Sequence, residues 1–417
     1  MKLAWAQAAA LLLAAAAADA QTFTQRGYVE GQLLLYPQEG QTDPQRGVGD
    51  VLVREELFAR PVAWLQVAAG ADLRANSHEQ VEDAWRLDWA DRGVRRPRLA
   101  VRRLAATVTR GPLTVDAGKQ FIRWGTTDII TPTDRFSPRD FLNVITSEFL
   151  PVVGARVTCG IAGDTFEGVW LPRMTPSRVP LFDQRWTVVP PEAAGFTVVD
   201  RGSEIPAGSQ VGVRWRHVAG GFEMALSYFD GFNHLPNIAS TVEASPPTII
   251  LRREYPRIRA FGADGALPTR WFTAKAEAEY FTDAARSPER MQQRSDDYVL
   301  YVIQFERQSG EWVFVGGYAG EYVTTSRGSL VFAPDRGLAR SFVGRAAYTI
   351  DPRRSLAVEG TVRRRGDGLY GKLEYSEARG RHWRATLAAV VISGHRDDFL
   401  GQYRRNSHVG VALRYSF

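Results

Sequence analysis

The chain has 417 residues, a formal net charge of +6 and a single cysteine, Cys159. One cysteine excludes an intramolecular disulfide, and no apolar stretch beyond the N-terminal segment reaches the roughly 18 residues that a transmembrane helix needs. The basic residues are spread along the chain without a basic tail, so we expect no nucleic-acid partner.

The N-terminus predicts a secretory signal peptide over residues 1–20. Lys2 precedes an apolar stretch from Leu3 to Ala18, and Ala18-Asp19-Ala20 is a small-x-small cleavage site. Cleavage after Ala20 would leave residues 21–417 as a single unit. A membrane-anchor helix is the alternative interpretation of this segment. A secreted chain without disulfides needs a large core or a closed sheet.

From residue 27 onward, stretches of about ten residues alternate apolar and polar positions, which predicts β-strands with two different faces. Tight turns join the strands in pairs, and longer polar segments separate the pairs. The predicted strands are residues 27–36, 50–59, 62–73, 98–109, 113–124, 155–161, 165–171, 210–218, 222–229, 249–261, 269–281, 298–306, 312–323, 341–349, 356–363, 370–376, 383–392 and 406–417. This layout is typical of an all-β transmembrane antiparallel β-barrel of about 18 strands, with 16 as the alternative.

The two faces of the strands predict which side chains face the lumen. A charged side chain against lipid costs on the order of 2–4 kcal/mol at the middle of a bilayer, so charges should point inward. The lumen-facing candidates are Arg214, Arg216, Lys275, Glu277, Glu279, Arg345, Glu359, Arg363 and Arg384. An interfacial aromatic girdle beside the short turns is predicted from Trp64, Trp271, Trp312 and Trp383.

The last strand carries Val409, Val411, Leu413, Tyr415 and Phe417 on one face. A final alternating strand that ends in phenylalanine resembles the C-terminal signal of outer-membrane barrel proteins. The resemblance implies recognition by the barrel-assembly machinery.

The loops carry the specificity of such a fold. Residues 76–93 predict a short helix with Ser77 as its N-cap, and the proline-rich residues 173–208 predict an irregular loop. The third long loop follows the predicted strand 113–124 and runs to about Pro151. Its apolar content predicts that it packs against another part of the protein instead of extending into solvent.

The charges of this loop and of the strand before it are the candidate pore constriction. They are Asp116, Lys119, Arg123, Asp128, Asp134, Arg135, Arg139 and Asp140. If the loop folds into the lumen, fixed charges would select solutes by sign and size. The alternative is structural: Asp134 and Asp140 cap local turns, while Arg135 and Arg139 pair with acids of the wall. Both interpretations can hold together.

The motifs G-K-Q-F-x-R-W-G-T-x-D at Gly118–Asp128, P-T-D-R-F at Pro132–Phe136 and P-R-D-F-L-N at Pro138–Asn143 resemble the signature of an uncharacterised family of Gram-negative outer-membrane β-barrels. The resemblance covers roughly residues 98–153 and implies fold and location only. The layout is also broadly similar to porins with an inward third loop.

The sequence therefore predicts a passive, water-filled channel for small polar or anionic solutes in the lipid of a Gram-negative outer membrane. The lumen-facing arginines favour a mild preference for anions. A non-conducting receptor, scaffold or export component is the alternative. A surface hydrolase is a third hypothesis, but the six histidines lie in no catalytic motif, so we expect no enzyme, cofactor or metal site. A homo-oligomer is compatible with this interpretation.

Overall fold

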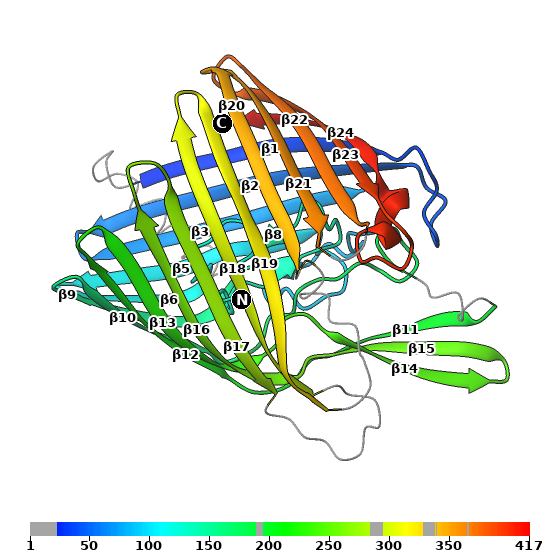
Figure 1. Ribbon diagram of the computed structural model, residues 1–417, viewed down its shortest axis with the longest axis horizontal. Helices are drawn as coiled ribbons and strands as arrows, with labels where there is room; N and C mark the ends of the chain where they lie inside the picture. The colour runs from blue at the N-terminus through cyan, green and yellow to red at the C-terminus, as the bar shows by residue number, and fades with distance from the viewer. Residues whose placement is uncertain (1–22, 189–194, 284–294, 328–337, 339, 365–366) are drawn as a thin grey trace, which may run out of the picture.

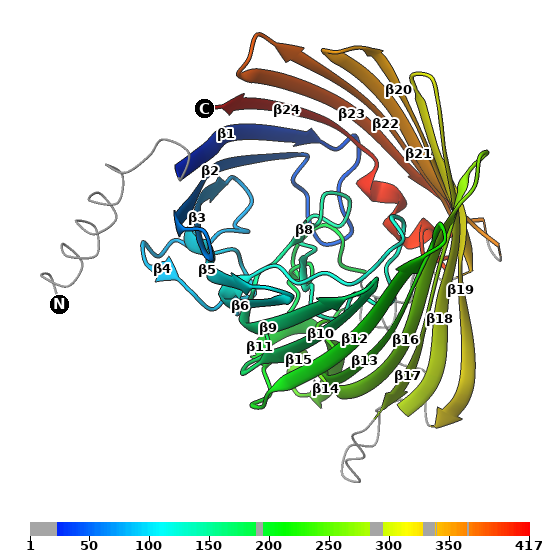
Figure 2. The same cartoon turned by 90° about the vertical axis from the view of Figure 1, so that its left-hand side faces the viewer.

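The computed structural model describes residues 23–188, 195–283, 295–327, 338, 340–364 and 367–417. The predicted signal peptide, residues 1–20, lies outside the described residues. The main sheet has 19 strands, of which β4 (Leu87–Asp88) is a two-residue strand within a loop, and the other 18 close into an antiparallel barrel. β1 pairs with β2 on one side and with β24 on the other, which closes the ring (Figure 2).

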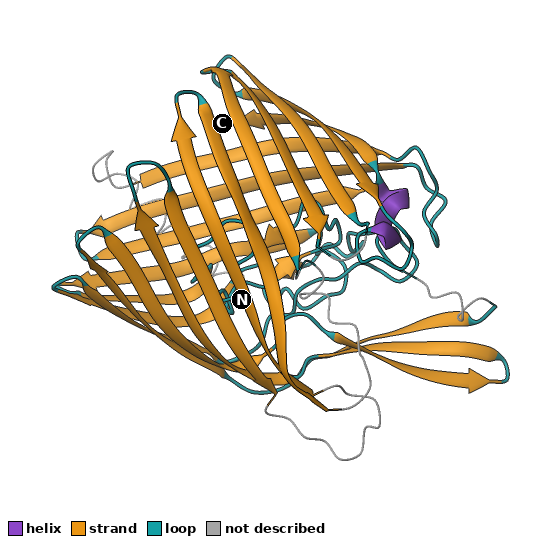
Figure 3. Cartoon of the chain, viewed as in Figure 1, coloured by secondary structure: helices purple, strands orange, loops and turns teal. Residues whose placement is uncertain are grey.

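Long loops lie at one end of the barrel and short turns at the other (Figures 1 and 3). The barrel strands are β1 (Phe23–Leu35), β2 (Gly47–Val62), β3 (Leu65–Asn76), β5 (Leu99–Arg110), β6 (Leu113–Gln120), β9 (Val152–Ile161), β10 (Asp164–Leu171), β12 (Gln210–Ala219), β13 (Phe222–Phe232), β16 (Arg257–Pro268), β17 (Thr273–Asp283), β18 (Ser295–Ser309), β19 (Trp312–Arg327), β20 (Ser341–Asp351), β21 (Arg354–Arg363), β22 (Leu369–Arg379), β23 (Trp383–Ser393) and β24 (His408–Ser416). The predicted count of 18 is confirmed.

Alternation along each strand separates an apolar outer face from an inner face. On β16, Phe261 and Leu267 are about half exposed on the outside, whereas Ala260 and Asp264 are buried on the inside. The four tryptophans predicted for the girdle are exposed beside the short turns. No helix within the described residues has the length and apolar character needed to span a membrane. A short 3-10 helix, η4 (Gly401–Asn406), precedes β24.

Two predictions about the region of β15 and β16 are wrong. The predicted turn at residues 262–265 lies inside β16, and the real turn follows Pro268. The glycines there serve close packing, since a Cβ at Gly262 would lie 2.4 Å from the Ser227 hydroxyl. The predicted strand 249–261 is also two strands, because Pro256 separates β16 from β15 (Pro247–Glu254).

β15 belongs to a small sheet that the sequence did not predict. It pairs in parallel with β11 (Thr197–Glu204) and antiparallel with β14 (Asn237–Ala244). The sheet projects from the long-loop end, beyond the barrel wall (Figure 1). The loop at residues 173–208 is therefore not wholly irregular.

The helix predicted over residues 76–93 does not form, although the whole segment is described. The Ser77 hydroxyl accepts a hydrogen bond from the Gly49 amide at 2.8 Å instead of capping a helix. The tertiary contact with β2 therefore outcompetes the local capping signal.

The third long loop lies inside the ring of strands, as predicted (Figure 2). β6 ends at Gln120, four residues before the predicted end, and the chain then leaves the wall. We call residues 121–151 the inner loop. It contains a two-stranded sheet of β7 (Arg139–Asp140) and β8 (Glu148–Phe149).

Candidate functional site

The inner loop is anchored to the wall by Glu277 on β17, whose side chain is 2% exposed. The hydroxyl of Thr127 donates to one carboxylate oxygen at 2.8 Å, and that of Thr133 donates to the other at 3.0 Å. The backbone amides of Thr126, Thr127 and Thr133 also donate to this carboxylate. A buried carboxylate must have such donors, so Glu277 fixes the loop against β17.

Two neighbouring charges of β17 bind the inner loop as well. Lys275 Nζ lies 2.8 Å from Asp128, and Glu279 lies 3.1 Å from Arg135 Nε. The Arg135 guanidinium also lies 4.9 Å from the centre of the Phe281 ring. The structure thus places Asp128 and Arg135 in wall contacts, which is the structural alternative foreseen for Arg135.

Aromatic packing completes this anchor. The Trp124 and Phe136 rings are 4.9 Å apart edge to face, and Phe136 meets Phe229 of β13 at 5.2 Å in the same geometry. These rings lie on Gly212 of β12, where a Cβ would approach Phe136 and Trp124 to 2.8 Å. Only glycine leaves room for the loop at this point.

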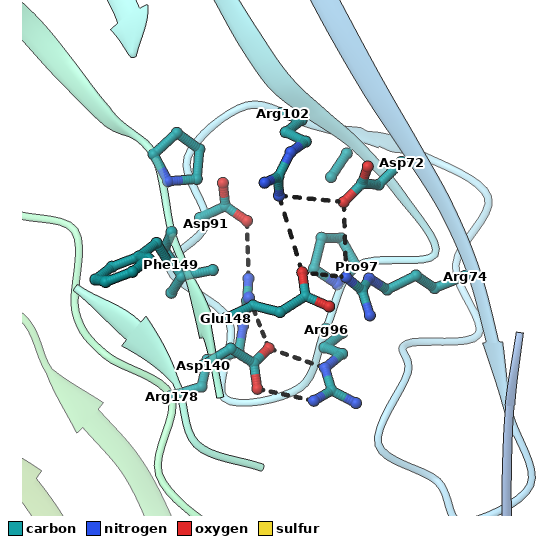
Figure 4. Close-up of a pocket in the computed structure, with 13 residues that line it drawn as sticks. Asp72, Arg74, Asp91, Arg96, Pro97, Arg102, Asp140, Glu148, Phe149 and Arg178 are labelled. Carbon is teal, nitrogen blue, oxygen red and sulfur yellow. Dashed lines mark hydrogen bonds and ion pairs between the residues drawn. The ribbon is translucent and has the colours of Figure 1, made fainter. Parts of the chain in front are cut away.

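The other side of the inner loop is held by a buried ion network (Figure 4). Asp140 lies 2.9 Å from Arg96 and 3.3 Å from Arg178. Arg178 also contacts Asp91 at 2.9 Å, and Asp91 contacts Lys119 at 2.7 Å. The network therefore joins β6, the inner loop, the loop 77–98 and the loop after β10. Lys119 and Asp140 were predicted, whereas Arg96, Asp91 and Arg178 were not.

Glu148 of the inner loop forms a second set of ion pairs. Its carboxylate lies 2.8 Å from Arg74 of β3 and 3.0 Å from Arg54 of β2. Burial raises the pKa of Glu148, but these two guanidinium groups outweigh it and hold the pKa well below its usual range. The carboxylate is therefore ionised and ties the inner loop to the wall opposite Glu277.

His234 connects three loops and was not predicted. Its ring nitrogens lie 2.6 Å from the Thr175 carbonyl oxygen and 2.8 Å from the Arg135 carbonyl oxygen. Burial lowers the pKa of His234 to about 4, while the hydrogen bonds to these two carbonyl oxygens favour the protonated ring and oppose the shift. No local motif could have shown this contact.

Other predicted residues have wall or local partners. Asp116 is in register with Arg156 and contacts it at 2.8 Å across β6 and β9. Asp134 accepts hydrogen bonds from the Ser137 hydroxyl at 2.7 Å and from the Trp124 amide at 3.2 Å. Burial raises the pKa of Asp134. These contacts fit the capping role foreseen for Asp134.

Four arginines differ from these paired charges; we call Arg102, Arg103, Arg123 and Arg139 the arginine cluster. Arg102 and Arg103 approach the Phe121 ring at 4.8 and 5.3 Å. A β-bulge opposite Gly70 and Ala71 brings these consecutive residues to the same side of the strand. Consecutive arginines break the strand alternation, which is the one sequence signal that could have revealed them.

Arg123 and Arg139 flank the Phe149 ring, each at 4.1 Å from its centre. Arg102 Nη1 lies 3.8 Å from the carboxylate of Asp72, and Arg123 Nε lies 3.6 Å from that of Asp134. Both distances are longer than a hydrogen bond. In the described part of the chain, no carboxylate lies within 4.0 Å of Arg103 or Arg139. Burial lowers the pKa of Arg139, the carboxylate of Asp134 opposes this shift, and the neighbouring Arg123 adds to it. The cluster is therefore a concentration of incompletely neutralised positive charge.

Some of the predicted lumen-facing residues of the other strands have ionic partners at close range. Arg214 contacts Asp264 at 2.8 Å, Arg216 contacts Glu223 at 2.7 Å, and Arg363 contacts Asp398 at 3.2 Å. Glu359 accepts a hydrogen bond from the Tyr370 hydroxyl at 2.7 Å and is in register with Arg345, while Arg384 is in register with Arg414. They lie on β12 and on β20–β23, whereas the arginine cluster lies on β5 and the inner loop. The described residues contain no group of three or more metal-ligating side chains.

Replacing Asp140 by asparagine is expected to destabilise the barrel by about 3 kcal/mol near neutral pH, because two buried guanidinium groups lose their shared carboxylate. Burial raises the pKa of Asp140, but Arg96 and Arg178 outweigh it and lower the pKa. The pKa of Asp140 is thus lower in the folded protein than in the unfolded chain, where it is about 4. The stabilisation is fully present when the pH is above the unfolded value, and it is lost as the pH falls toward the folded value.

Denaturant unfolding in detergent at neutral pH and at about pH 3 measures this contribution. The difference in free energy of unfolding between the wild type and Asp140→Asn should be smaller at the acid pH. Asp351→Asn, at an exposed short turn, is the control and should show a small gap at both. An equal gap for Asp140→Asn at both pH values would contradict the prediction.

Comparison with known proteins supports the fold. No protein-family model matches the sequence, and no curated protein matches it. A BenF-like porin from Pseudomonas fluorescens Pf-5 aligns over 95% of this chain and 97% of its own, with a TM-score of 0.55 and 12% identity. Acinetobacter baumannii OccAB4 aligns over 95% of this chain and 98% of its own, with a TM-score of 0.55 and 8% identity. Pseudomonas aeruginosa OccK5 (OpdH) aligns over 95% of this chain and 98% of its own, with a TM-score of 0.53 and 10% identity. The chain has the 18-stranded barrel architecture of these structures.

Proposed function

We propose that this protein is an outer-membrane channel for the passive diffusion of small polar and anionic solutes. A closed ring of strands with an apolar outer face fits a bilayer, and a loop held inside it narrows the lumen. Porins that share the fold support the proposal. A signal peptide cleaved after Ala20 and a last strand read by the assembly machinery would take the chain to that membrane.

The arginine cluster is the observation that carries the preference for anions. Several inward charges, including Arg156, Arg214 and Arg216, are paired at hydrogen-bond distance, so their fields largely cancel beyond the pair. Arg102 and Arg123 have carboxylates only at 3.6 to 3.9 Å, and Arg103 and Arg139 have none within 4.0 Å among the described residues. All four lie on the inner loop and the strand beside it. Uncompensated positive charge in a low-dielectric opening raises the local concentration of anions.

Single-channel recording tests the proposal. The refolded mature protein in a planar bilayer is expected to give discrete conductance steps. Under a salt gradient, the reversal potential should show selectivity for anions, because the cluster attracts them. A folded barrel that gives no steps would overturn the channel. Steps with cation selectivity would overturn the role of the cluster. Refolding is checked by circular dichroism before recording.

A further inference from the structure

A charged patch lies on the outer wall at the long-loop end of the barrel. Asp230 of β13 is in register with Arg259 of β16, and Arg257 lies at the start of β16. Their neighbours Phe229 and Ala260 form the next registered pair and point inward, with exposures of 1% and 0%. Because successive side chains alternate, Asp230 and Arg259 point outward, toward the surrounding lipid.

The geometry of the patch leaves one positive charge in excess. Arg257 Nη2 lies 2.6 Å from Asp230, and Arg259 Nε lies 3.7 Å from the other carboxylate oxygen. The Arg257 side chain is 41% exposed and that of Arg259 is 54% exposed. One carboxylate thus orients two guanidinium groups, and in the described part of the chain no other carboxylate lies within 4.0 Å of either group. Paired guanidinium groups match the oxygens of a phosphate.

The height of the patch fits the headgroup region. One registered row below it on the outer face, the Tyr228 and Phe261 rings lie 5.1 Å apart, and Tyr280 is paired in register with Phe261. Phe261 is 50% exposed and Tyr280 is 36% exposed. Exposed aromatic rings mark the boundary of the hydrocarbon core in barrels of this kind. Arg257 and Arg259 lie beyond that boundary, at the level of lipid phosphates.

We propose that Arg257, Arg259 and Asp230 form a binding site for a phosphate group of the phosphorylated glycolipid in the outer leaflet. The inference rests on the proposed outer-membrane location. The long loops face outward in such a membrane, so this end of the wall meets the glycolipid leaflet and not the phospholipid leaflet. Binding would stabilise the folded barrel by mass action.

Lipopolysaccharide titration of the detergent-refolded barrel, followed by thermal unfolding, tests the site. The melting temperature of the wild type should rise with lipopolysaccharide. The Arg257→Gln/Arg259→Gln variant should need a roughly 10-fold higher concentration for the same rise, because two charge-assisted contacts are lost. The matched control is Arg110→Gln/Arg270→Gln, which removes two arginines stacked on Trp64 and Trp271 at the short-turn end. It should respond like the wild type.

If the melting temperatures of the wild type and of Arg257→Gln/Arg259→Gln rose at the same lipopolysaccharide concentrations, the proposed site would be wrong. A parallel titration with phosphatidylglycerol separates the two lipid sources. If phosphatidylglycerol stabilised the wild type as much as lipopolysaccharide does, and the double variant weakened this effect too, the assignment to the glycolipid would be wrong. If the double variant does not fold, Arg259→Gln carries the comparison, since its contact with Asp230 is the longer one. Conductance is measured separately, so a silent barrel that binds lipopolysaccharide leaves this site standing.

Discussion

The Arg123→Glu/Arg139→Glu variant is expected to lose its selectivity for anions. The exchange changes the charge of the arginine cluster from four positive groups to two positive and two negative ones. Both side chains flank Phe149 and have no carboxylate at hydrogen-bond distance in the described structure, so little pairing opposes the change. The electrostatic effect is large because charges beside low-dielectric protein walls are screened less than charges in bulk water.

Reversal potentials under a salt gradient measure the shift. Arg379→Glu/Arg381→Glu makes the same change in charge at the exposed turn between β22 and β23, outside the constriction, and should leave the selectivity near that of the wild type. Arg135→Gln is a second control. Because Arg135 is tied to Glu279, this variant should lower stability more than selectivity. An unchanged reversal potential in the double cluster variant would remove the cluster from the solute path.

Replacing Glu277 by alanine should release the inner loop from the wall and raise the single-channel conductance. The carboxylate accepts hydrogen bonds from the backbone and hydroxyl groups of Thr127 and Thr133. Each buried donor left without an acceptor costs about 1–3 kcal/mol, so the anchored conformation loses several kcal/mol. A loosened loop would also make the current noisier.

Glu359→Ala is the matched control for this variant. Glu359 is also an inward glutamate, but its partner is Tyr370 on the neighbouring strand and not the inner loop. Its conductance should stay close to that of the wild type. If the conductance of Glu277→Ala also stayed close to that of the wild type, the loop would keep its place without this anchor.

The barrel itself could be predicted because its signal is local. A strand with lipid on one side and water on the other must alternate, so Val213 outside and Arg214 inside follow from a period of two. The errors came where two local signals competed. Gly262 and Gly265 indicated a turn, but they allow close contacts within a long strand. Ser77 resembled a helix cap, but its hydroxyl binds β2.

The candidate site could be predicted only in part. The inner loop and its charges were found from its proline-bounded motifs and its apolar content. The fate of each charge depended on partners far away in sequence: Glu277 and Glu279 are more than a hundred residues from Thr127 and Arg135, and Arg178 comes from another long loop.

The sequence alone therefore determined a barrel of about 18 strands, the inward side of the strands that alternate cleanly and the presence of a long third loop. These properties follow from periodicity and from the cost of burying charge in lipid. Only the tertiary structure decided which inward charges are neutralised. Ion pairing requires groups within about 4 Å, and that proximity is set by how the loops cross the barrel. The same reason explains why Arg139 is left without a close carboxylate in the described structure, while Arg135 is paired.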